Sequence, residues 1–263
     1  MIRALKALST SVRIRCDDSA IGNQLDALFA TFPSTDEAPV LDYRIERGAS
    51  GYQLCRNQEL VYSDSDADAM APALELDLYR QVPRLGAGAW VLHGAGIVRN
   101  EKAIVLCGPS GAGKTTVTRA LLDRGWLYLS EEMCSIDRDG WVRGLRRPLH
   151  TSAESGHARY RLRDELGRVV ERGLWLPRAE QMLEQARLGV LVLLSYTPNR
   201  DTTCERVGSG EALVQAWTQT LDVRPWALAT ATKLLRGIPC VRLQASDRHE
   251  AIAALETLAK EIR

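Results

Sequence analysis

The sequence has no hydrophobic stretch long enough to span a membrane. Its longest apolar run lies near residues 188–194, far short of the roughly 20 residues that a membrane helix needs. The N-terminus lacks the hydrophobic segment of a secretory signal. The net charge of +1 offers no overall basic excess of the kind that nucleic-acid-binding proteins carry. We therefore expect a cytoplasmic protein with neither membranes nor nucleic acids as partners.

The cysteines have no metal-binding spacing, and the chain has no internal repeat or low-complexity tract. The six cysteines are Cys16, Cys55, Cys107, Cys134, Cys204 and Cys240. Several fall in segments that predict strands, and cysteines of a cytosolic protein are normally reduced. We expect buried free thiols rather than disulfides or a zinc site.

Lysine is scarce, with five residues against 29 arginines, yet one lysine occupies a recognisable motif. Residues 108–116 read Gly-Pro-Ser-Gly-Ala-Gly-Lys-Thr-Thr and match the phosphate-binding pattern G-x-x-x-x-G-K-[ST]. Residues 103–107 before them predict a short buried strand, and residues 116–124 after them predict a helix that stops at Gly125. A strand, loop and helix in this order indicate a nucleoside triphosphate site.

The residue types in the loop suit a triphosphate. Glycines let backbone N–H groups approach phosphate oxygens that a Cβ would obstruct, and the following helix points its positive end at the same place. Lys114 would reach the β and γ phosphates of ATP, and Thr115 would offer its hydroxyl to Mg²⁺. The expected nucleotide-binding residues are Gly108, Ser110, Gly111, Ala112, Gly113, Lys114, Thr115 and Thr116.

A pair of acidic residues follows soon after the predicted helix. The best later strand, residues 188–195, ends without an acid, whereas residues 125–130 predict a short strand that ends in Glu131 and Glu132. If this strand lay beside the first in a parallel sheet, both carboxylates would be level with the phosphate loop. Adjacent residues on a strand face opposite ways, so one could bind Mg²⁺ and the other accept a proton. A solvated acidic turn is the alternative.

These segments together resemble the core of the HPr kinase/phosphorylase family, a phosphate-loop kinase fold related to phosphoenolpyruvate carboxykinase. The family core reads His-Gly, strand, G-x-S-G-x-G-K-[ST], helix, Arg-Gly, strand and Asp-Asp. In this chain, His93-Gly94, the loop, Arg124-Gly125 and Glu131-Glu132 follow that order without a gap. Shorter relatives, including kinases that phosphorylate a serine of lasso-peptide precursors, look closer in length and in the stretch Arg147-Pro148-Leu149.

The resemblance implies roles for single residues. The aspartate that acts as the family's base aligns with Glu131, and the aspartate that binds Mg²⁺ aligns with Glu132. Glutamate is one methylene longer, and a misplacement of about 1 Å can cost on the order of a hundredfold in rate. His93 aligns with a histidine near the family's catalytic centre and would orient the base or contact the γ-phosphate. The Glu-Arg-Gly signature of HPr kinases has a partial match only at residues 171–174, and its spacing from the core motifs differs from that of the family. We therefore expect neither HPr as the substrate nor phosphorylase activity.

A basic segment follows the acidic pair. Residues 143–178 contain nine arginines, no lysine and four acids. Arginine forks suit phosphates and carboxylates, and Arg146 and Arg147 are the predicted site residues that would neutralise transferred charge. Weak periodicity predicts mostly loop or short helix here. A solvated basic surface remains the competing interpretation.

The length of 263 residues allows one large domain, or a main domain with a small accessory one. The predicted domains are a small α+β module over residues 1–84 and an HPr-kinase-like kinase domain over residues 85–263, with a boundary at Pro83–Gly88. The module has predicted strands at 11–16, 40–45, 52–55 and 59–62 and helices at 21–29 and 67–80. The kinase domain adds strands at 89–92 and 240–243 and helices at 211–221, 227–235 and 248–262. The predicted fold class is α/β.

The sequence thus predicts an ATP-dependent kinase with Mg²⁺ as cofactor and a peptide or small protein as the acceptor. The serine acceptor rests on the resemblance alone. A kinase of a small metabolite, and a nucleotide-binding switch protein without transfer activity, remain alternatives. The sequence leaves the choice between ATP and GTP open, and a homo-oligomer is compatible with it.

Overall fold

The computed structural model describes residues 1–86, 88–163 and 168–262. These form two compact units: unit 1 comprises Met1–Leu85 and Arg146–Leu176, and unit 2 comprises Gly86–Leu145 and Pro177–Arg263. The chain first passes from unit 1 to unit 2 after Leu85. The predicted domains differ in placing residues 146–176 in the kinase domain, whereas this segment clusters with unit 1.

Unit 1 is built on a five-stranded sheet in the order β1-β2-β3-β4-β5. Its strands are β1 Ile2–Ala7, β2 Thr10–Cys16, β3 Leu41–Gly48, β4 Gly51–Arg56 and β5 Glu59–Asp64, and its helices are α1 Ser19–Leu28, the 3-10 turn η1 Ala67–Ala69 and α2 Met70–Leu85. Only β2 and β3 run parallel. The α+β character is as predicted, and β1 is an additional strand.

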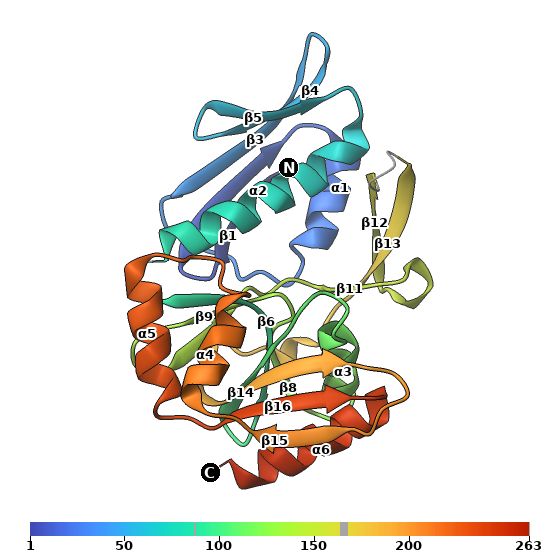
Figure 1. The fold of residues 1–263 in the computed structure, drawn as a ribbon. Helices are drawn as coiled ribbons and strands as arrows, with labels where there is room; N and C mark the ends of the chain where they lie inside the picture. Colours follow the sequence, from blue (N-terminus) through green and yellow to red (C-terminus); the bar gives the residue numbers. More distant parts are fainter. Residues whose placement is uncertain (87, 164–167, 263) are drawn as a thin grey trace. The chain divides into compact units, whose positions relative to one another are not determined.

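Two helices lie against the sheet of unit 1 (Figure 1). Asp18 caps α1 by accepting hydrogen bonds from the N–H groups of Ala20 and Ile21, the residue type and geometry that start a helix. Pro83, which the sequence places at a domain boundary, lies inside α2. It is tolerated near the C-terminal end of the helix, so the connection to unit 2 starts only after Leu85.

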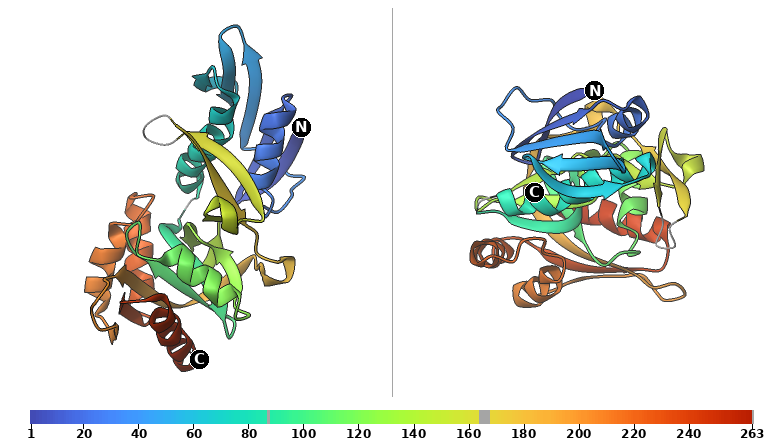
Figure 2. Two further views of the ribbon diagram at one scale, coloured as in Figure 1. Left: turned by 90° about the vertical axis from the view of Figure 1, so that its right-hand side faces the viewer. Right: turned by 90° about the horizontal axis from the view of Figure 1, so that it is seen from above.

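The arginine-rich segment forms a small sheet in unit 1 rather than the loop or short helix that its weak periodicity predicts. Its elements are β11 Leu149–Thr151, η2 Ala153–Ser155, β12 Ala158–Arg163 and β13 Val169–Trp175, with sheet order β11-β13-β12. β12 packs against α1 (Figure 2). The antiparallel ladder supplies the backbone hydrogen bonds, so these strands form without the apolar alternation that sequence patterns detect.

Unit 2 contains an eight-stranded mixed sheet in the order β10-β9-β6-β7-β14-β16-β15, with β8 paired to β6. Its strands are β6 Trp90–Arg99, β7 Lys102–Cys107, β8 Leu127–Ser130, β9 Met133–Ile136, β10 Trp141–Gly144, β14 Gln185–Tyr196, β15 Thr203–Arg206 and β16 Cys240–Ala245. Its helices are α3 Lys114–Leu122, η3 Ala179–Gln181, α4 Ser209–Trp217, α5 Pro225–Leu235 and α6 Arg248–Glu261. The strands and helices predicted here are present with shifted ends.

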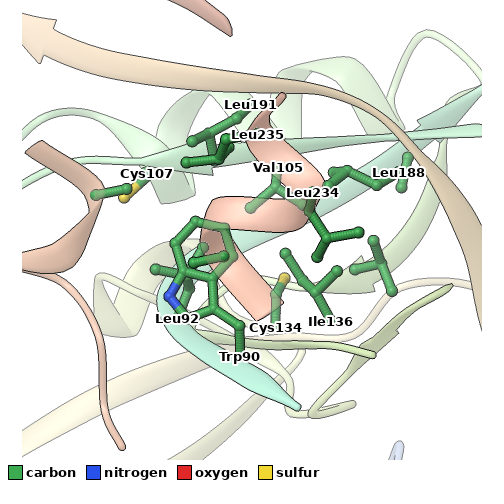
Figure 3. Close-up of a cluster of buried hydrophobic side chains, with 14 of the residues drawn as sticks. Trp90, Leu92, Val105, Cys107, Cys134, Ile136, Leu188, Leu191, Leu234 and Leu235 are labelled. Atoms are coloured by element: carbon green, nitrogen blue, oxygen red, sulfur yellow. The ribbon is translucent and has the colours of Figure 1, made fainter. Parts of the chain in front are cut away.

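Alternate residues of the central strands enter two separate cores. Val105 and Leu191 face one cluster, to which α5 contributes Leu234 and Leu235 (Figure 3). α4 adds Ala212 to the same cluster. The strand neighbours Ile104, Leu106, Val190 and Val192 face the other cluster, which α3 and α6 cover. The period of two along a strand therefore builds a layered α/β unit with apolar strands buried on both faces.

The described residues include no helix with the length and apolar character needed to cross a bilayer. All six cysteines are free thiols. Five are buried, whereas Cys204 on β15 is exposed, which corrects the expectation of burial for that residue.

Candidate functional site

The predicted phosphate loop joins β7 to α3 in unit 2. Gly111 and Gly113 have φ values of 81° and 90°, in the left-handed region that favours glycine. The Gly113 backbone forms the N-terminal cap of α3 without a side-chain bond, and the helix begins at Lys114, two residues before the predicted start. The first turn of α3 therefore presents its unpaired N–H groups next to an open glycine backbone.

Gly108 packs against the neighbouring strand. A Cβ built on Gly108 would lie 2.1 Å from the carbonyl oxygen of Leu194 on β14. By contrast, a Cβ on Gly111 or Gly113 would meet no atom within 4 Å. The first glycine thus lets the loop approach β14, and the later two supply the backbone turn and leave space above it. This cradle fits a phosphate group.

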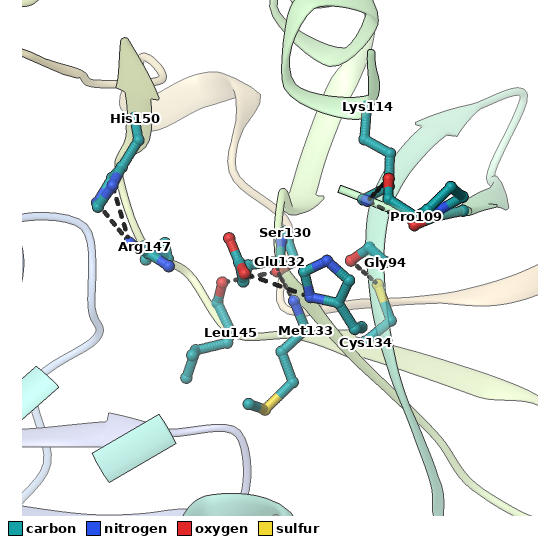
Figure 4. A network of polar contacts seen from close by, with 12 residues as sticks. Gly94, Pro109, Lys114, Ser130, Glu132, Met133, Cys134, Leu145, Arg147 and His150 are labelled. Carbon is teal, nitrogen blue, oxygen red and sulfur yellow. Dashed lines mark hydrogen bonds and ion pairs between the residues drawn. The ribbon is translucent and has the colours of Figure 1, made fainter. Parts of the chain in front are cut away.

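Lys114 is folded back over the loop. Its side chain is only 7% exposed, and Nζ donates to the carbonyl oxygens of Gly108 at 2.7 Å and Pro109 at 3.0 Å (Figure 4). Burial lowers the pKa of Lys114, and the negative charge of Glu131 opposes that shift. The charge of Glu131 therefore acts on Lys114.

Strand β6 lies between the strand that precedes the loop and the strand that precedes the acidic pair. β8 does not lie beside β7 as the parallel-sheet prediction assumes: it pairs antiparallel with β6, which itself pairs antiparallel with β7. β7 and β8 consequently run in the same direction with β6 between them. Gly94 of β6 lies opposite Cys107 of β7, and its N–H donates to the carbonyl of Glu132 at 3.0 Å. Cys107, Gly94 and Glu132 therefore form one row across the sheet, and the phosphate loop starts at the residue after Cys107.

The two glutamates interrupt a ladder rather than end it. β8 and β9 both pair with β6, and residues 131 and 132 form the break between them. Ser130 shapes the break: its hydroxyl donates to the Leu145 carbonyl at 2.9 Å and accepts from the N–H groups of Glu132 and Met133 (Figure 4). The sequence pattern does not single out Ser130, because an isolated serine at a strand end carries no signal.

The glutamates differ in environment. Glu131 is only 3% exposed, whereas the Glu132 side chain is 28% exposed and its Oε1 lies 3.3 Å from His93 Nδ1. His93 lies inside β6, opposite Met133, and not after a strand that ends at Leu92 as the sequence predicts. The structure thus brings His93, Lys114, Glu131 and Glu132 into one part of unit 2.

The other loop residues are placed as follows. Ala112 is buried and its N–H donates to the Pro109 carbonyl, while Ser110 and Thr116 are exposed. Thr115, the predicted Mg²⁺ ligand, lies half-buried in the first turn of α3. The described residues contain no group of three or more His, Cys, Asp and Glu side chains arranged to hold a metal. A site made of one hydroxyl, one carboxylate and phosphate oxygens would not need such a group.

Arg146 and Arg147 belong to unit 1, and each has contacts there. The Arg146 carbonyl accepts from Thr31 Oγ1 at 2.6 Å. Arg147 is 8% exposed, forms an ion pair with Glu75 at 3.0 Å and lies over the ring of Tyr79. Its guanidinium also bonds to His150 (Figure 4). These contacts stabilise unit 1, and a catalytic role for either arginine stays a prediction.

Solved structures resemble this chain, whereas family models and curated proteins do not. No family model matches the chain, and no curated protein matches it significantly. Among solved structures, the HPr(Ser) kinase/phosphatase from Coxiella burnetii aligns with 65% of this chain and 94% of its own, with 10% identity and a TM-score of 0.34. A likeness this distant carries no argument about activity.

Proposed function

We propose that the protein is a phosphotransferase that uses a nucleoside triphosphate, with ATP as donor and a hydroxyl group as acceptor. One observation carries the proposal: the row Cys107–Gly94–Glu132 places an acidic pair beside the start of a glycine loop that leads into α3. Phosphoryl transfer needs a phosphate cradle, a cation and a group that accepts a proton at one point. These residues supply candidates for all three.

The chain's own groups divide the work as follows. Loop N–H groups would bind phosphate oxygens, and Lys114 Nζ would exchange the Gly108 and Pro109 carbonyls for the β and γ oxygens. Glu131 would accept the proton of the acceptor hydroxyl. Glu132, oriented by His93, and Thr115 would hold Mg²⁺. Mg²⁺ bound there would neutralise charge on the transferred phosphoryl group.

The acceptor is a proposal of its own. We propose a serine of a peptide or small protein. The support is the resemblance of residues 93–132 to the HPr kinase core, and of the chain length and Arg147-Pro148-Leu149 to the short kinases of lasso-peptide precursors. A small-metabolite acceptor and a binding protein without transfer activity are the alternatives. The longer Glu131-Glu132 pair in place of Asp-Asp is the feature that favours the last of these.

The test is transfer from γ-labelled ATP with Mg²⁺ to serine-containing peptides encoded near the gene and to a panel of metabolites. Lys114→Ala should remove nucleotide binding or transfer, and Lys260→Ala, an exposed lysine on α6, is the matched control. Label on a peptide would support a peptide acceptor. Label on a metabolite would instead show that the acceptor is a small molecule. Tight ATP binding without label on any acceptor supports the switch protein. Equal nucleotide binding and turnover in Lys114→Ala would overturn the proposal.

A further inference from the structure

Unit 2 contains a cavity of about 320 Å³ beside the phosphate loop, on the side of α3 and α6. Gly113 and Thr116 line it from the loop and the start of α3, Tyr196 from the end of β14, and Asp247 and Arg248 from the start of α6. Its volume is within the range of small-ligand sites, which is about 300–1,000 Å³. None of the roles proposed above uses Tyr196, Asp247 or Arg248.

The position of Lys114 gives the bound nucleotide a direction. Its Nζ lies at the carbonyls of Gly108 and Pro109, and these two residues line a different hollow, of about 270 Å³ next to α4. A phosphate-loop lysine contacts the β and γ phosphates, so the transferred end of a nucleotide in this loop would lie on the Gly108 side. The nucleoside end would then leave the loop past Thr116, on the side of the α3–α6 cavity.

The cavity offers the two chemical groups that a nucleoside needs. Tyr196 is 51% exposed although it ends a strand that is buried from Leu188 to Leu194. An exposed aromatic ring is a platform on which bases stack. Asp247 caps α6 through Oδ1 alone, which accepts from the N–H groups of His249 and Glu250. A carboxylate has about four acceptor sites, so Oδ2 retains the capacity to accept from ribose hydroxyls.

We propose that the cavity between α3 and α6 is the nucleoside subsite, in which Tyr196 stacks on the base and Asp247 accepts hydrogen bonds from the ribose. The proposal rests on the proposed function, because it assumes that phosphates occupy the loop. It goes beyond the proposed function by assigning residues that bind the base and the ribose, and it explains why Tyr196 is exposed.

The experiment compares ADP and inorganic pyrophosphate, both with Mg²⁺, by isothermal titration calorimetry on the full chain. Wild type should bind ADP more tightly than pyrophosphate. Tyr196→Ala should weaken ADP binding about five- to a hundredfold and leave pyrophosphate binding unchanged, while Tyr196→Phe keeps the ring and the affinity. Lys260→Ala, at an exposed position on α6 that lines neither hollow, should bind both ligands as wild type does.

Asp247→Ser gives a second, independent measurement. Serine keeps a helix cap but removes the carboxylate, so ADP binding should fall about tenfold with pyrophosphate unchanged. The subsite is overturned if Tyr196→Ala binds ADP as tightly as wild type, or if it weakens pyrophosphate equally. If wild type binds ADP no more tightly than pyrophosphate, the nucleoside subsite is overturned but the proposed function is not. Wild type that binds neither ligand overturns the proposed function with it.

Discussion

His93 Nδ1 of β6 lies 3.3 Å from Glu132 Oε1, at the break between β8 and β9. At the same break, the N–H of Gly94 donates to the Glu132 carbonyl. The backbone and the side chain of Glu132 are therefore both held by β6, the strand that also pairs with β7. In the proposed site this double attachment would position Glu132 as a ligand, while the charge of the buried Glu131 acts against the lowering of the Lys114 pKa by burial.

The first prediction separates the two glutamates. Glu131→Gln should lower transfer on the order of a hundredfold or more while nucleotide binding stays near wild type, because general-base catalysis contributes about 10²–10⁴-fold. Glu132→Gln should instead raise the Mg²⁺ concentration needed for half-maximal nucleotide binding. Initial rates and binding isotherms across a Mg²⁺ series measure both effects. The same loss in both variants, independent of Mg²⁺, would contradict the division of roles.

The second prediction concerns the close approach of the loop to β14. Gly108→Ala adds a Cβ that would lie 2.1 Å from the Leu194 carbonyl, so β7 and β14 must shift, at a cost of about 1–3 kcal/mol. We expect a lower Tm and loss of the thermal stabilisation by Mg²⁺-ADP. Gly210→Ala on α4, where a Cβ meets no atom within 4 Å, is the control and should leave both unchanged. A Gly108→Ala protein that ADP still stabilises would show that this contact does not shape the loop.

The third prediction is a pH dependence of stability in unit 1. Burial, with the charges of Arg147 and Arg172, lowers the pKa of His150 to about 2, whereas an unperturbed histidine titrates near 6.5. Below pH 6.5 the unfolded chain therefore binds a proton at His150 that the folded protein does not. Stability should fall as the pH decreases from there towards 2, by up to about 1.4 kcal/mol per pH unit.

Urea unfolding at pH 7 and pH 5 tests this expectation. The stability of wild type should fall more over this range than that of His150→Gln, which cannot titrate. His249→Gln, at an exposed position in α6, should follow wild type. An identical pH dependence in wild type and His150→Gln would show that the buried imidazole contributes nothing to the acid sensitivity.

The fourth prediction concerns the polar contact between α2 and the sheet of unit 1. Asp77 accepts from the buried Tyr43 hydroxyl at 2.7 Å and from Arg56 Nη1 at 2.7 and 2.8 Å. Hydrogen bonds to a charged group contribute about 1.5–3 kcal/mol, so Asp77→Asn should reduce the free energy of unfolding by about 2 kcal/mol. Asp26→Asn breaks an exposed pair with Arg3 and should cost less than about 1 kcal/mol. Urea titrations measure the free energy of unfolding of both variants. An equal decrease in the two would show that the Asp77 contacts contribute no more to stability than an exposed ion pair.

Several elements of the fold could be predicted because their signals are local. The buried strand before the glycine loop, α3 after the loop and the closing helix α6 follow from adjacent residues. The arginine-rich sheet could not be predicted, because β11, β12 and β13 are stabilised by pairing with one another and by α1. The positions of Ser130 beside the acidic pair and of Tyr196 beside the cavity could not be predicted either, because both depend on residues distant in the chain.

By itself, the sequence determined the chemistry that the protein carries: a glycine loop with one lysine, two carboxylates and a histidine. Only the tertiary structure decided how these meet. β6 lies between β7 and β8, so Gly94 links the end of β7 to Glu132, and residues 146–176 fold with unit 1 instead of unit 2. Local propensities act over a few residues, whereas strand order and pairing depend on contacts between distant segments, and no short pattern encodes them.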